Sequence, residues 1–171
     1  MVEMEACMPD GWLIHDFLHD ARVGYTVLPH RPAFTAQDEA AAVHVSGRDW
    51  AKVVVCIVDG WPIEAVLPAA AYVNLDRLLE LAGGTHIRLA GEDELLRLFP
   101  DCEVGAMPPF GPLYGQSVFV DVALAGESDI VFNAGTHTEA IRMRWPDFAA
   151  AVRPIVGRFA DLPPDRGFSF A

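Results

Sequence analysis

Lysine is almost absent from this chain, which holds a single lysine among its twelve basic residues. Aspartate and glutamate together number 24, so the formal net charge at pH 7 is −12. Proteins that bind along a phosphate backbone need clustered Lys and Arg side chains. The composition therefore argues against DNA as a partner and limits any contact with RNA to a small footprint.

Long hydrophobic runs and a secretion signal are also missing. No stretch reaches the ~18 consecutive apolar residues that a membrane helix needs, and Met1–Glu5 is acidic where a signal peptide would be basic. Cys7, Cys56 and Cys102 lack a CxxC spacing and are odd in number, which fits free thiols in a reducing compartment. We therefore expect a cytoplasmic protein with no membrane contact.

The common cofactor motifs are missing as well. The sequence contains no GxGxxG, no P-loop and no zinc-ligand spacing. These absences remove the usual nucleotide and metal hypotheses, and we expect no cofactor and no metal.

The chain is rich in core-forming residues, since 52% of its 171 residues are hydrophobic. A chain of this length and composition is expected to fold as one domain. We place that domain at residues 1–162. Pro163-Pro164-Asp165, followed by Gly167, predicts a loose tail over 163–171.

Periodicity and turn signals predict a mixture of helices and strands. Asp10, Thr35 and Asn74 are expected helix N-caps, and Asp59-Gly60 between two apolar runs is a strong hairpin signal. Without a regular strand–helix–strand alternation, the pattern favours an α+β fold with a mixed, mostly antiparallel sheet flanked by helices. Helices are expected at 11–21, 35–42, 75–81, 92–99 and 146–159, and strands at 23–28, 52–58, 61–67, 86–89, 118–122, 129–133 and 139–143.

Lys52 opens the most strand-like run of the chain, 52–58. An ammonium there is a compact charge whose pKa shifts readily on partial burial, which suits a cation that anchors or activates a substrate. A solvated residue at a strand end is the alternative.

Two further segments carry candidate chemistry. In Gly105–Gly111, two glycines bracket two prolines, which predicts a stiff loop with fixed N–H groups able to stabilise an oxyanion. His137 at the start of a strand could bind a ribose hydroxyl, orient a water or act as a base. The alternatives are a rigid connector and a structural histidine hydrogen-bonded to the backbone.

Taken together, these segments resemble the YbaK family, the free-standing relatives of the editing domain inserted in bacterial prolyl-tRNA synthetase. The similarity extends over about residues 23–155. The stretches that carry it, in the family's order, are Pro32–Gln37, Ala51–Val55, Val73–Leu78, Gly105–Gly111, Val118–Asp121 and Val131–His137.

The resemblance implies a barrel-like mixed sheet and an aminoacyl-tRNA deacylase, a carboxylic ester hydrolase that edits in trans for translation fidelity. Lys52 matches the family's essential lysine, Gly105 and Pro109 match the ends of its GxxxP loop, and His137 matches its late histidine. In the family these residues surround the terminal adenosine and the aminoacyl ester.

From this resemblance we expect Lys52, Gly105 and His137 to be catalytic. Lys52 would hold the terminal phosphate or the ester carbonyl, and N–H groups near Gly105 and Ala106 would stabilise the oxyanion. A water or a substrate hydroxyl would be the nucleophile. The substrate-binding residues are expected to be Thr26, Leu28, His30, Phe34, Ala106, Met107, Pro108, Pro109, Phe110, Gly111 and Gly135.

Two departures leave the edited amino acid and the tRNA open, with tRNA-Pro as one candidate. Val53-Val54 follows the lysine where cysteine-specific members commonly have Thr-Leu, and Asn74 replaces a common aspartate. The acidic surface suits contact with the CCA end only, with a synthetase or an elongation factor delivering the tRNA. Competing hypotheses are a non-catalytic module that binds aminoacyl-adenosine or a protein, and an unrelated small-molecule barrel.

Overall fold

The computed structural model describes residues 11–163. The acidic segment Met1–Glu5, Cys7, the expected cap Asp10 and the expected tail from Pro164 onward lie outside the described residues.

The fold is α+β, as predicted, and is built on a mixed sheet with the strand order β1-β8-β7-β2-β3-β6-β9. Pairing is antiparallel for β1–β8, β7–β8, β2–β3 and β2–β5, and parallel for β2–β7, β3–β6 and β6–β9. A separate antiparallel pair joins β4 to β10. The strands are β1 Tyr25–Pro29, β2 Trp50–Val58, β3 Trp61–Pro68, β4 Tyr72–Val73, β5 Ile87–Leu89, β6 Ser117–Asp121, β7 Asp129–Asn133, β8 Glu139–Arg144, β9 Ile155–Gly157 and β10 Ala160–Asp161.

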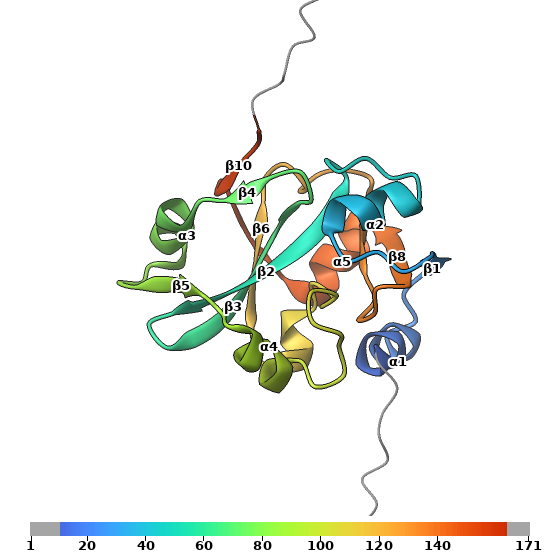
Figure 1. Ribbon diagram of the computed structural model, residues 1–171, viewed down its shortest axis with the longest axis horizontal. Helices are drawn as coiled ribbons and strands as arrows, with labels where there is room; N and C mark the ends of the chain where they lie inside the picture. The colour runs from blue at the N-terminus through green and yellow to red at the C-terminus, as the bar shows by residue number, and fades with distance from the viewer. Residues whose placement is uncertain (1–10, 164–171) are drawn as a thin grey trace, which may run out of the picture.

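Helices lie around this sheet (Figure 1), with β2, β3 and β6 crossing the middle of the molecule. Helix α3 lies at one end of the view, while α1 and α2 lie toward the other end near β1 and β8. The helices are α1 Trp12–Asp20, α2 Ala36–Ala42, α3 Leu75–Ala82, α4 Glu92–Leu98 and α5 Trp145–Val152, with a 3₁₀ turn, η1, at Gly111–Tyr114.

The predicted hairpin at Asp59-Gly60 is confirmed. Both residues have positive φ, 48° and 87°, which is the backbone that a two-residue hairpin turn requires. The Asp59 carboxylate also accepts hydrogen bonds from the backbone N–H groups of Thr85 and His86, at 2.9 and 2.8 Å. The turn that joins β2 to β3 is thereby tied to the segment that enters β5.

Two of the predicted caps are confirmed. Thr35 Oγ1 accepts from the backbone N–H of Asp38 at 3.2 Å, and Asn74 Oδ1 accepts from that of Arg77 at 3.1 Å. Each bond satisfies one of the N–H groups that a helix start leaves unpaired. At α1 the N-cap position is taken by Gly11, whose φ is 74°.

The last helix is shorter than the sequence predicted. It ends at Val152 because Arg153 adopts a left-handed backbone, with φ 52°, and Pro154 has no N–H to continue the helix. Residues 155–157 form β9 in place of the expected helical turns, and residues 160–161, beyond the predicted helix, form β10.

Strand β2 separates from β7 soon after the two strands meet. They pair only at Trp50–Val131 and Ala51–Phe132, and on that side β2 pairs next with β5, from Cys56 onward. Between these two pairings, Val53 and Val55 pack against a cluster that contains Met107 of the 101–111 loop. The loop with the candidate glycine therefore packs against the part of β2 that neither β7 nor β5 pairs with.

Within residues 11–163, no helix is both long and apolar enough to cross a membrane.

Candidate functional site

Lys52 lies in β2, and its ammonium is held by backbone carbonyls. Nζ donates to Ala71 O at 2.5 Å and to Ala69 O at 3.3 Å, both in the turn between β3 and β4. It also lies 5.8 Å from the ring centroid of Tyr72, whose side chain is exposed. Burial lowers the pKa of the Lys52 ammonium. Among residues 11–163 no carboxylate forms an ion pair with it, so its charge is not neutralised within the described structure.

His137 lies in a closely bonded environment, and its residue is only 7% exposed. Nδ1 lies 2.8 Å from Glu39 Oε1, and Nε2 lies 2.8 Å from Val104 O. Its backbone N–H donates to Glu103 Oε2 at 2.7 Å. Burial by itself would lower the pKa of His137, but the bonds to Glu39 and Val104 and the charges of Glu39 and Glu103 outweigh it and raise the pKa.

Glu39, the partner of His137, is also buried, at 1% exposure, and comes from the middle of α2. Its second oxygen accepts from Asn133 Nδ2 at 2.8 Å. Burial raises the pKa of Glu39, opposed by its hydrogen bonds to Asn133 and His137. Helix α2, strand β7 and the segment before β8 thus meet in one hydrogen-bonded chain.

Gly105 is the one exposed residue of the predicted loop Gly105–Gly111. Its φ is +89°, a backbone conformation that favours glycine. A Cβ at this position would lie 3.5 Å from His137 Cε1, so the structure brings Gly105 and His137 into contact. By contrast, the predicted substrate-binding residues that follow in the loop are all buried: Ala106, Met107, Pro108, Pro109, Phe110 and Gly111.

The N–H groups of this loop are not equally available. The Ala106 N–H, expected from the sequence to stabilise an oxyanion, already donates to Glu103 O at 3.0 Å. The Gly105 N–H instead approaches Met107 Sδ at 3.3 Å. Because a thioether sulfur is a weak acceptor, a better acceptor on a ligand could replace it. Gly105 is therefore the stronger candidate as a donor.

Of the remaining predicted residues, Thr26 and Phe34 are exposed, whereas Leu28, His30 and Gly135 are partly or fully buried. Phe34 is 75% exposed, and its ring centroid lies 5.0 Å from that of His137, while Thr26 is exposed on β1 opposite Arg142. Leu28 packs on the cluster around Trp50, and His30 lies edge-on to the Trp50 ring at 6.4 Å. Gly135 is buried, and a Cβ there would meet Gly11 Cα at 2.6 Å, so close packing accounts for this glycine.

The structure thus joins Gly105, His137 and Phe34 through direct contacts. Lys52 makes its own contacts at the β3–β4 turn, and among the described residues no hydrogen bond links it to Gly105 or His137. Sequence reasoning missed Glu39, Glu103 and Tyr72. An acidic residue before a run of alanines was the one available signal for Glu39, and it is too common to be diagnostic.

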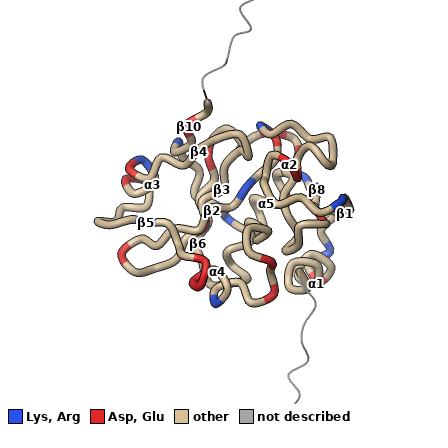
Figure 2. The backbone as a smooth tube through the Cα atoms, in the orientation of Figure 1, with Lys and Arg blue, Asp and Glu red and all other residues tan. Residues whose placement is uncertain are grey.

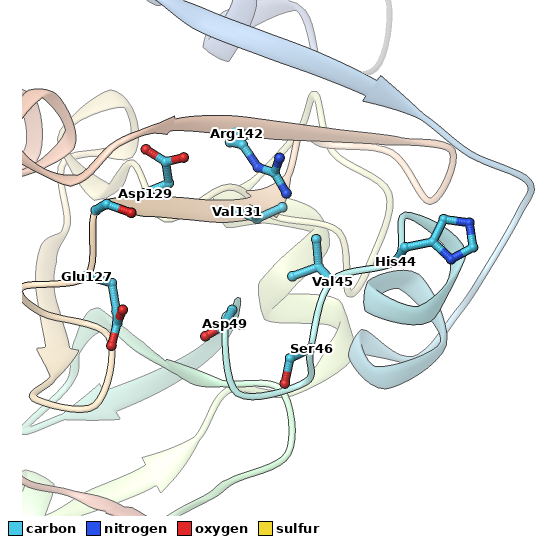
Figure 3. Close-up of a pocket in the computed structure, with 9 residues that line it drawn as sticks. His44, Val45, Ser46, Asp49, Glu127, Asp129, Val131 and Arg142 are labelled. Carbon is cyan, nitrogen blue, oxygen red and sulfur yellow. The ribbon is translucent and has the colours of Figure 1, made fainter.

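A separate hollow of about 290 Å³ lies between the segment that follows α2 and strands β7 and β8 (Figure 3). Its wall carries the acidic side chains Asp49, Glu127 and Asp129, with Arg142 on β8. None of the predicted catalytic residues lines it. The hollow is therefore distinct from the contacts of Gly105, His137 and Lys52 that make up the candidate site.

Charged positions are dispersed over the backbone (Figure 2), and in this view the basic positions form no continuous stripe. Two exposed arginines are paired with acids, Arg77 with Asp161 at 2.9 Å and Arg88 with Glu94 at 2.7 Å. Within residues 11–163 no group of three or more His, Cys, Asp and Glu side chains is arranged to hold a metal ion.

Among protein families, the chain matches the model described as the aminoacyl-tRNA editing domain. The match spans residues 30–151, which include Lys52, Gly105 and His137. No curated protein sequence matches the chain.

Solved structures with the same fold match nearly the whole chain. The hypothetical protein APE2540 has a TM-score of 0.78 and 20% identity, with 87% of this chain and 99% of that one covered. A proposed trans-editing enzyme for prolyl-tRNA synthetase also has a TM-score of 0.78 and 20% identity, with 91% and 99% covered. An epitope scaffold made by computational backbone grafting has a TM-score of 0.79 and 19% identity, with 90% and 98% covered. At these identities the similarity shows the fold.

Proposed function

The chain belongs to the aminoacyl-tRNA editing domain family, and from this premise we propose that it is a hydrolase that edits in trans by cleaving the ester of a mischarged tRNA. The observation that carries the proposal is the family match over residues 30–151, which spans an unneutralised Lys52 ammonium and a Gly105 N–H whose one partner is a weakly accepting sulfur. The first offers a charge for an anion, and the second offers a donor for a carbonyl oxygen.

The reaction requires little from the protein. An aminoacyl ester is already activated, so positioning and stabilisation of the oxyanion can supply much of the catalysis. Water adds through its oxygen to the ester carbonyl carbon, the bond from that carbon to the ribose oxygen breaks, and a proton from the water ends on the ribose hydroxyl. The products are a free amino acid and a deacylated tRNA.

The described residues suit distinct roles in this reaction. The Lys52 ammonium uses two of its three N–H groups on backbone carbonyls, and we assign the third to the phosphate of the terminal nucleotide. The Gly105 N–H would leave the Met107 sulfur and donate to the ester carbonyl oxygen, where negative charge develops. His137 is poorly placed to act as the base, because both of its ring nitrogens already have partners.

Contact with the tRNA is proposed to be limited to the CCA end. A net charge of −12 opposes a grip on the acceptor stem, so a synthetase or an elongation factor would deliver the substrate. If one phosphate is neutralised, the logarithm of the binding constant for a single-stranded CCA end should fall with a slope of about −0.7 against the logarithm of the salt concentration. A several-fold steeper slope would contradict this limited contact.

The decisive experiment measures deacylation of the Ala, Ser, Thr and Cys esters of tRNA-Pro by the wild type and by Lys52→Met. Methionine retains most of the apolar stem and removes the charge. Arg97→Met is the matched control, because it removes an exposed cation from α4, which carries none of the candidate residues. Selective release by the wild type and by Arg97→Met, lost in Lys52→Met, would support the proposal and identify the amino acid.

Two results would overturn the proposal. Equal release by Lys52→Met and wild type would remove the role of Lys52. Stoichiometric binding of aminoacyl-adenosine with no release from any ester, by a folded protein, would favour a non-catalytic binding module.

A further inference from the structure

The peptide group between Val104 and Gly105 connects His137 to the candidate oxyanion donor. A peptide group is planar and trans, so the Val104 C=O and the Gly105 N–H belong to one plane and point in opposite directions. His137 Nε2 lies 2.8 Å from Val104 O. A hydrogen bond that fixes the carbonyl therefore fixes the direction of the N–H as well.

The acceptor determines which proton His137 must carry. A backbone carbonyl can only accept, so Nε2 must be protonated for this bond to form. On the other side of the ring, Nδ1 lies 2.8 Å from Glu39 Oε1, and Asn133 donates to the other oxygen of Glu39 at 2.8 Å. Glu39, Asn133 and His137 are each less than 10% exposed, so this arrangement is shielded from water.

We propose that Glu39 and His137 are positioning residues that orient the Val104–Gly105 peptide so that the Gly105 N–H faces the ester carbonyl oxygen. The inference rests on the proposed function for the identity of the acceptor. The orientation itself is a property of the free protein and can be measured without a substrate.

The conformation of Gly105 agrees with this assignment. An added Cβ would lie 3.5 Å from His137 Cε1, which is ordinary van der Waals contact, so space alone does not require glycine here. The requirement is the φ of +89°, which turns the peptide in a way that other residues rarely adopt. Gly105 is also the exposed residue of this loop, whereas the next six residues are buried, so a ligand at the loop would meet Gly105 first.

The proposal predicts a particular dependence on pH. The charged groups that face the His137–Glu39 pair are Glu103, which accepts from the His137 backbone, and His30, whose charge acts on Glu39. At low pH the imidazolium donates from both nitrogens, to Glu39 and to Val104 O. When it loses one proton, the Glu39 carboxylate retains the proton on Nδ1 as the stronger acceptor. A lone pair on Nε2 then faces Val104 O, and the peptide is released.

Whether deacylation rises or falls with pH depends on the direction in which the pKa of His137 is shifted. The folded structure raises the pKa of His137 above its ordinary value of 6.5, so the orientation is present below the raised pKa and lost as the pH rises through it. Deacylation by the wild type should therefore fall with rising pH, after subtraction of uncatalysed hydrolysis.

Glu39→Gln should remove this decline, because its amide can donate to Nδ1 of a neutral His137 while its oxygen accepts from Asn133. Nε2 then keeps its proton at high pH. A residue that served only the stability of the fold would give no such selective change in the pH profile.

The experiment combines nitrogen-15 NMR of the His137 ring and of the Gly105 amide with kinetics, for the wild type, Glu39→Gln and His137→Ala. Glu92→Gln, on the exposed start of α4, is the control. We expect the Gly105 amide of the wild type to titrate with His137, and that of Glu39→Gln to remain constant. We expect kcat to fall roughly 10²- to 10³-fold in His137→Ala, as for the loss of one oxyanion donor, with KM little changed.

The proposal is overturned if the Gly105 amide does not follow the titration of His137, or if Glu39→Gln keeps the wild-type midpoint. If His137→Ala does not fold, Glu39→Gln alone decides between these results. If no ester is hydrolysed by any variant, the proposed function fails, while the NMR titration still judges the orientation. If hydrolysis proceeds but the amide is indifferent to His137, only this inference fails.

Discussion

Glu64 on β3 should destabilise the protein at neutral pH, and its replacement should raise the melting temperature. The residue is completely buried, and neither carboxylate oxygen has a hydrogen-bond partner of ordinary geometry among the described residues. Burial raises the pKa of Glu64 well above its ordinary value of 4.5, and the nearby Gly111 N–H only partly opposes this. Unpaired buried carboxyl groups are costly in either protonation state, and the ionised form costs more.

The magnitude can be bounded from these contacts. A buried polar group without a partner costs about 1–3 kcal/mol, so Glu64→Met should stabilise the fold by about that amount. For a domain of this size, 1 kcal/mol corresponds to about 2–4 °C in melting temperature. The expected gain is thus roughly 2–12 °C.

The pH dependence of stability distinguishes the cost of burying a charge at position 64 from the cost of burying an unpaired polar group there. Because the folded pKa lies above the unfolded one, the stability associated with Glu64 is fully present below about pH 4.5 and declines as the pH rises toward the folded pKa. Glu64→Gln removes only the charge, so it should raise the melting temperature at about pH 8 and have little effect at about pH 4.

Thermal unfolding followed by circular dichroism at both pH values would measure this, with the exposed Glu80→Gln on α3 as the control. A lower melting temperature for both Glu64 variants at the higher pH would refute the reasoning. That result would mean that the carboxylate has a stabilising partner in solution.

Three further predictions test the fold and the loop. Asp121→Ala should lower the unfolding free energy by about 3–5 kcal/mol in denaturant titrations, since the buried carboxylate accepts from three backbone N–H groups at 2.7–2.9 Å; a loss under 1 kcal/mol would contradict this. Asn74→Ala should cost about 1 kcal/mol by the same assay, because it removes the N-cap of α3, and a Ser at this position should recover most of it. Gly105→Ala should lower the unfolding free energy by about 1–2 kcal/mol, because alanine rarely adopts the positive φ of this residue, and it should also reduce deacylation. Gly115→Ala, also at positive φ but outside the candidate residues, should leave deacylation unchanged.

The parts of the fold that were predictable from sequence depend on contacts between near neighbours. The caps at Thr35 and Asn74 use side chains within three residues of the backbone groups they satisfy, and the Asp59-Gly60 turn depends on the positive φ of its own two residues. Such chemistry is visible in a short window. The last helix was predicted too long because an apolar run continues past Pro154, where the backbone ends the helix and forms β9.

The candidate site was only partly predictable because its geometry depends on long-range contacts. Gly105 and His137 could be selected by residue type, but the bond of His137 to Glu39 joins residues 98 apart in the chain. Periodicity marks Glu39 as one more polar residue of a short helix, with no sign that it is buried. Likewise, the sequence predicted a stiff loop after Gly105, whereas its burial, which leaves Gly105 as the exposed point, is set by packing against β2.

The choice of lysine at position 52 follows from its acceptors. Two backbone carbonyls converge on Nζ from the β3–β4 turn, and a tetrahedral ammonium can serve both and still direct a third N–H elsewhere. A planar guanidinium presents its donors as a rigid fork suited to a carboxylate or a phosphate, as Arg88 does with both oxygens of Glu94. Carbonyls orient the cation without neutralising it, and partial burial strengthens its attraction for an anion. A chain with a net charge of −12 can in this way keep one local positive charge for a single phosphate.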